Sequence, residues 1–84
     1  MKMREYIWLV SYLVKDENGD VAGYKTAFEA PDPIMACMQA GDFFRVTNEP
    51  ESETLITSVG LADEESAELI GEVVVDTLAI DWPE

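Results

Sequence analysis

The chain has 84 residues, which is enough for one domain with a single hydrophobic core. It contains eighteen Asp and Glu but five Lys and Arg, and its formal net charge is −13. A protein of this sign repels nucleic acid and anionic membrane, so we expect it to bind neither directly. Because 48% of its residues are hydrophobic, it is too apolar for a disordered acidic tail, and we expect one folded domain over residues 1–84.

Residues 5–14 are rich in aromatic and β-branched residues, which is typical of a strand. Asn18-Gly19 then predicts a tight hairpin turn, because this pair tolerates positive φ angles, and residues 20–29 return as the second strand. A two-residue loop would pair Leu13 with Tyr24 and place the following residues on the core side of the sheet: Ile7, Leu9, Leu13, Tyr24 and Phe28. The other side of the first strand would be an apolar surface, which either the chain or a partner must cover: Trp8, Val10, Tyr12 and Val14.

Asp32 followed by Pro33 predicts the start of a helix, since Asp is a good N-cap and Pro suits the first helical position. A buried stripe is expected at Ile34, Cys37, Met38 and Gly41, with Gly41 ending the helix. Residues 43–47 fit a short third strand, and residues 48–53 have the composition of a loop.

Residues 54–61 alternate and predict a strand, with Leu55, Thr57, Val59 and Leu61 on one face. Residues 63–70 fit a short second helix capped by Asp63, and residues 72–81 fit a final strand. The predicted class is therefore α+β. We expect an antiparallel sheet of four to five strands that opens with a β-hairpin, one or two helices packed on one face, and the order β-β-α-β-β-α-β.

Catalytic, metal and cofactor sites are not expected. Asp16-x-Asn18-x-Asp20 matches the first three positions of a calcium loop, but Val21 and Ala27 stand where that loop needs Gly and Glu. The single cysteine, Cys37, has no His anywhere in the chain to activate it. One cysteine permits no internal disulfide, which fits a reducing compartment, and we expect a cytoplasmic protein.

The strongest pattern is the distribution of charge. Residues 49–84 contain eleven acidic residues and no basic one, whereas residues 1–48 contain seven acids and five bases. The pattern predicts a non-enzymatic inhibitor or antagonist that occupies the basic groove of a nucleic-acid-binding protein, and the alternative for these acids is a solubilising surface. The expected contact residues are Glu49, Glu51, Glu53, Asp63, Glu64, Glu65, Glu68 and Glu72.

The alternative function is a small assembly or docking module, either a homodimer or an adaptor. Its interface would be apolar, because aromatic side chains are the usual anchors of protein interfaces. The residues expected there are Trp8, Val10, Tyr12, Val14 and Trp82.

Overall fold

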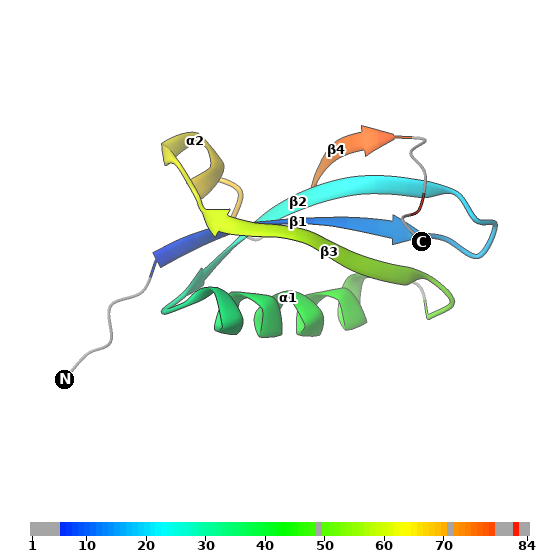
Figure 1. Cartoon of the computed structure of the whole chain (residues 1–84), viewed down its shortest axis with the longest axis horizontal. Coiled ribbons are helices and arrows are strands. Elements are labelled where there is room, and N and C mark those ends of the chain that lie inside the picture. The colour runs from blue at the N-terminus through cyan, green and yellow to red at the C-terminus, as the bar shows by residue number, and fades with distance from the viewer. Residues whose placement is uncertain (1–5, 49, 71, 79–81, 83–84) are drawn as a thin grey trace.

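The computed structural model describes residues 6–48, 50–70, 72–78 and 82 (Figure 1). The elements are β1 (Tyr6–Lys15), β2 (Val21–Ala30), α1 (Pro33–Thr47), β3 (Glu53–Leu61), α2 (Glu64–Ala67) and β4 (Val74–Leu78). The four strands form one antiparallel sheet in the order β3-β1-β2-β4. The predicted α+β class and the opening hairpin are confirmed.

The hairpin loop has three residues, Glu17 to Gly19, and the predicted two-residue loop is wrong. The Gly19 N–H donates to the Asp16 carbonyl at 3.0 Å, and the Asp16 N–H donates to the Asp20 carbonyl at 2.9 Å. Gly19 has φ 87°, so the loop is a type I turn followed by a left-handed residue. The extra residue shifts the register by one, and Tyr24 pairs with Tyr12 instead of Leu13.

This shift moves the main core to the other side of β1. Val10 and Tyr12 are 0% and 3% exposed, and the half-buried side chains packed against them include Tyr24, Phe28 and Ile56. The apolar side of β1 that was expected to need a cover is therefore covered by the chain itself. α1 lies along this side of the sheet, and α2 lies on the opposite side (Figure 1).

α1 runs through Gly41, so residues 43–47 are helical and the predicted third strand there is wrong. Asp32 caps the helix as expected, because its side chain accepts the Met35 N–H at 2.8 Å. The buried stripe is Ala36 and Ala40, with Phe44 continuing it one turn later. Small residues at this stripe let the helix approach a sheet face already filled by the aromatic rings of Tyr12, Tyr24 and Phe28.

The predicted stripe of α1 is consequently inverted. Ile34 and Met38 face solvent, and Cys37 and Gly41 are half-buried at its edge. The predicted helical spacing of the buried stripe is correct, but the residues that face the core are Ala36, Ala40 and Phe44.

β3 contains an irregularity opposite Ser11 and Tyr12, where the pairing passes from Ser58 to Ile56 and leaves Thr57 as the extra residue. Ile56 and Val59 therefore both pack on the α1 side of the sheet, and the expected alternation of Leu55, Thr57, Val59 and Leu61 on one face is wrong.

α2 has four residues, and the chain after it runs along the outer edge of β2. The Ala27 N–H donates to the Leu69 carbonyl at 3.3 Å, and the Thr26 hydroxyl donates to the Glu72 carbonyl. β4 then pairs with β2 from Ala22 to Lys25. No helix in the described part of the chain is long and apolar enough to cross a membrane.

Candidate partner-binding surface

The acidic residues expected to bind a partner fall into two groups, one at each end of β3. Glu51 lies in the turn before this strand, and Glu53 begins it. Asp63, Glu64, Glu65 and Glu68 lie at or within α2, which follows the other end of the strand. Eight residue steps separate Glu53 from Leu61, so the two ends of β3 are about 26 Å apart along the sheet.

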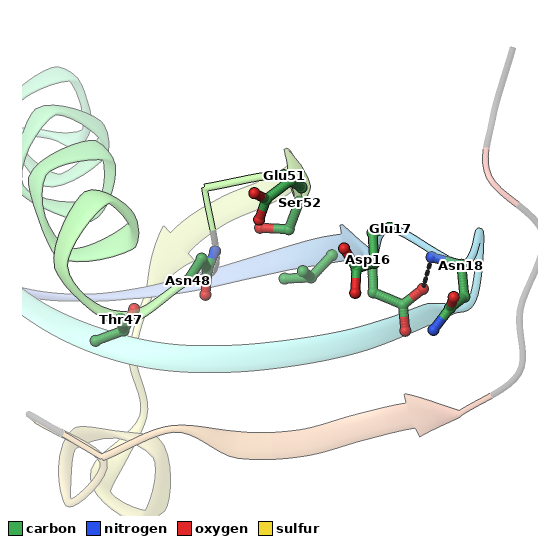
Figure 2. A pocket seen from close by; sticks show the side chains of 8 residues that line it. Asp16, Glu17, Asn18, Thr47, Asn48, Glu51 and Ser52 are labelled. Carbon is green, nitrogen blue, oxygen red and sulfur yellow. Dashed lines mark hydrogen bonds between the residues drawn. The ribbon is translucent and has the colours of Figure 1, made fainter.

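The first group is enlarged by the hairpin loop. Glu51 lines an open hollow of about 490 Å³ together with Asp16, Glu17 and Asn18 from the loop and Thr47 and Asn48 from the end of α1 (Figure 2). Glu53 lines an adjoining depression with the same loop. We call Asp16, Glu17, Glu51 and Glu53 the hairpin-end cluster. Asp16 and Glu17 were not predicted for this surface, because they lie far from Glu51 and Glu53 along the chain and only the antiparallel pairing of Lys15 with Glu53 brings them together.

Local hydrogen bonds hold the backbone around the hairpin-end cluster. One carboxylate oxygen of Asp16 accepts the backbone N–H groups of Asn18 and Asp20, each at 2.9 Å. The Asn48 side chain donates to the Thr54 hydroxyl at 2.8 Å and ties the end of α1 to β3. The Asp16 carboxylate thus stabilises its own loop. Among the described residues, no group of three or more His, Cys, Asp or Glu is suited to hold a metal ion.

The second group, Asp63, Glu64, Glu65 and Glu68, is called the α2 cluster. The Asp63 carboxylate caps α2 by accepting the Ser66 N–H at 2.7 Å. Hydrogen bonds from the backbone and the hydroxyl of Ser66 lower the pKa of Asp63, burial opposes them weakly, and Lys25 adds a small attraction. Glu64 and Glu65 occupy the first turn, where the helix dipole favours negative charge.

Two of the expected contacts lie apart from these clusters. α2 ends at Ala67, so the predicted helical stripe of Glu64, Glu68 and Glu72 is wrong, and Glu72 lies on the segment leading to β4. Glu49 lies outside the described residues.

The fold brings bases of the first half toward acids of the second. Lys15 lines the same depression as Glu51 and Glu53, and its Nζ lies 5.8 Å from the centroid of the Trp82 ring. Lys25 weakly attracts the Asp63 carboxylate. Arg45, in contrast, pairs with Asp42 of its own helix at 3.5 Å. The charge separation is therefore milder in space than along the sequence, but every described acidic residue except Asp32 remains exposed.

The residues of the alternative apolar interface have mostly internal contacts. Val10 and Tyr12 are in the core beneath α1, and Val14 packs against them. Trp8 is half-buried, and its indole N–H donates to the Ala30 carbonyl at 2.9 Å. Trp82 is half-buried beside Lys15. In this conformation Val10 and Tyr12 are not accessible to a partner.

No protein-family model matches this chain, and no curated protein or solved structure matches it either.

Proposed function

We propose that the protein is a non-enzymatic inhibitor that occupies the basic groove of a nucleic-acid-binding protein. The observation that supports this most is the exposure of both acidic clusters, one at each end of the same strand. A separation of about 26 Å equals roughly eight base pairs of duplex, at about 3.4 Å per phosphate along each strand. The two clusters would take the places of phosphates at the two ends of such a groove.

The mechanism is competitive occlusion. Opposite charge would steer the protein to its target and raise the association rate, and the bound protein would exclude the nucleic acid. DNA mimics, anti-CRISPR or anti-restriction proteins of phages, and antitoxins or immunity proteins against basic nucleases work on this principle. Such a protein would act in the cytoplasm of a bacterial or phage-infected cell.

The target can be identified by affinity capture from the lysate of the native host at low salt, followed by elution in salt steps. We expect one or a few nucleic-acid-binding proteins to elute as salt rises, because a charge-driven complex is screened by added ions. A target without a basic nucleic-acid-binding surface, or one retained equally at high salt, would contradict the proposal.

A further inference from the structure

The outer edge of β3 is open in the described part of the chain. The sheet order places β1 on one side of β3 and no described strand on the other (Figure 1). Every residue of β3 is at least partly exposed, and Leu61 is 65% exposed. A Cβ placed on Gly60 would find no atom within 4 Å. The end of the strand around Gly60 and Leu61 is therefore accessible to a partner.

The register of β3 shows which backbone groups point to this free edge. The Ala62 N–H donates to the Ile7 carbonyl at 2.9 Å and continues the ladder between β1 and β3. In an antiparallel ladder, residues hydrogen-bonded to the neighbouring strand alternate with residues whose N–H and C=O point away from it. Counting back from Ala62, the backbone groups of Leu61 and Val59 point away from β1. These groups can pair with an added strand.

β3 lacks two of the features that protect a free sheet edge. It contains no Lys and no Pro, and its one irregularity, at Thr57, lies before residues 59–61. Pairing with β3 of a second copy would bring the acidic clusters of two copies together, which the net charge of −13 opposes. A strand from a different protein is the better match for this edge.

The charge around the edge favours a basic strand. The α2 cluster begins with Asp63, two residues after Leu61, and Glu53 of the hairpin-end cluster stands at the other end of β3. No Lys or Arg follows Arg45 in the sequence. An extended segment laid along β3 would meet carboxylates at both ends, so Lys and Arg in that segment would be attracted and Asp and Glu repelled.

We propose that β3 binds an extended, basic segment of the target protein by strand addition. The segment pairs with the backbone of residues 59–61, and its Lys or Arg side chains lie against the α2 cluster. Backbone hydrogen bonds supply affinity, and the carboxylates supply the preference for a basic sequence. This inference rests on the proposed function, because it names the part of the target that the acidic surface holds.

Two synthetic peptides with alternating Lys and Val, each matching the nine residues of β3, test the proposal. They carry the same charge, but every backbone N–H of the second is methylated, so it cannot form a strand ladder. At roughly 50 mM NaCl, the unmethylated peptide should bind at least about tenfold more tightly, and it should slow hydrogen exchange of the Val59 and Leu61 amides severalfold. Equal binding of both peptides, or no binding of the first at about 1 mM, would overturn strand addition.

A matched pair of variants locates the site. Leu61→Lys places a positive charge on the free edge and should weaken binding of the unmethylated peptide at least about fivefold. Met38→Lys makes the same charge change at a 60% exposed position of α1 and should weaken it less than about twofold. Both variants should melt like the parent, because both positions are exposed. Equal weakening would place the peptide elsewhere and overturn the proposal.

Strand addition and the proposed function can fail separately. Peptide binding is measured without a captured target, so it does not depend on which protein the lysate yields. A nucleic-acid-binding target held by the acidic clusters alone would still be captured and eluted by salt, while the two peptides would bind equally or not at all. That combination of results would overturn strand addition and leave the proposed function standing.

Discussion

The rings of Tyr12 and Phe44 lie with their centroids 4.4 Å apart and join β1 to α1. Tyr12 also stacks on Tyr24 of β2 at 5.8 Å, so one side chain links the helix to two strands. The buried residues of α1, Ala36 and Ala40, are small, and Phe44 is a large side chain of this helix that packs against the core cluster.

Phe44→Ala should therefore destabilise the protein by about 2–3 kcal/mol, somewhat below the usual value for a fully buried phenylalanine, because Phe44 is half-buried. Urea unfolding followed by circular dichroism measures the change. Met38→Ala on the exposed side of the same helix is the control and should stay within about 0.5 kcal/mol of the parent. Similar losses for both variants would mean that the faces of α1 have been assigned wrongly.

Gly19→Val should destabilise by more than about 1 kcal/mol, since a β-branched residue is strained at φ 87°. Gly41→Ala is the matched control, because Gly41 is helical and has open space around it. That substitution should raise the free energy of unfolding by about 0.5–1 kcal/mol. A Gly19→Val variant that melts like the parent would contradict the turn geometry.

Stability should fall at alkaline pH because of Tyr12. Burial raises the pKa of its hydroxyl, while a hydrogen bond with Thr26 lowers it and the neighbouring Tyr24 adds a smaller increase. Because the pKa of Tyr12 is higher in the folded state than in the unfolded state, its contribution to the free energy of unfolding is fully present below the unfolded pKa of about 10. That contribution is lost as the pH rises above this value toward the folded pKa. Unfolding free energies of the parent and Tyr12→Phe between about pH 8 and pH 11 should show a shallower decline in the variant. If the parent and the variant lose stability in parallel as the pH rises, Tyr12 is not the cause of the decline.

The local elements were predictable from the sequence, and their mutual placement was less so. Asp32-Pro33 marked the start of α1, Asp63 marked the cap of α2, and Asn18-Gly19 marked the hairpin, because caps and turns are decided by neighbouring residues. The loop length depended on Asp16, whose carboxylate accepts two backbone N–H groups and stabilises a three-residue loop. One residue in that loop decided which side of β1 forms the core under α1.

The errors in α1 and in the acidic surface have physical reasons of their own. Gly41 ended the predicted helix, but Phe44 beyond it gains enough burial to offset the cost of a helical glycine, about 1 kcal/mol relative to Ala. Asp16 and Glu17 join Glu51 and Glu53 only through the pairing of β1 with β3, which local patterns do not contain.

Both ends of β3 should contribute to the rate of target binding. Removing two charges at one end (Glu51→Gln with Glu53→Gln) or at the other (Glu64→Gln with Glu65→Gln) should slow association severalfold at low salt. The control pair, Glu29→Gln with Asp76→Asn, removes two exposed charges from β2 and β4 and should have a smaller effect. Stopped-flow mixing with the captured target measures these rates. Equal slowing in all three would indicate that net charge matters and position does not.

Competition for the target tests occlusion most directly. The captured target is loaded with a labelled nucleic acid at low salt, and the protein is added while fluorescence anisotropy reports the bound fraction. Occlusion predicts that nucleic acid is released in proportion to the protein bound, and that the variant lacking Glu51, Glu53, Glu64 and Glu65 carboxylates releases it only at higher concentration. A ternary complex in which the target holds both ligands with undiminished affinity would contradict the account.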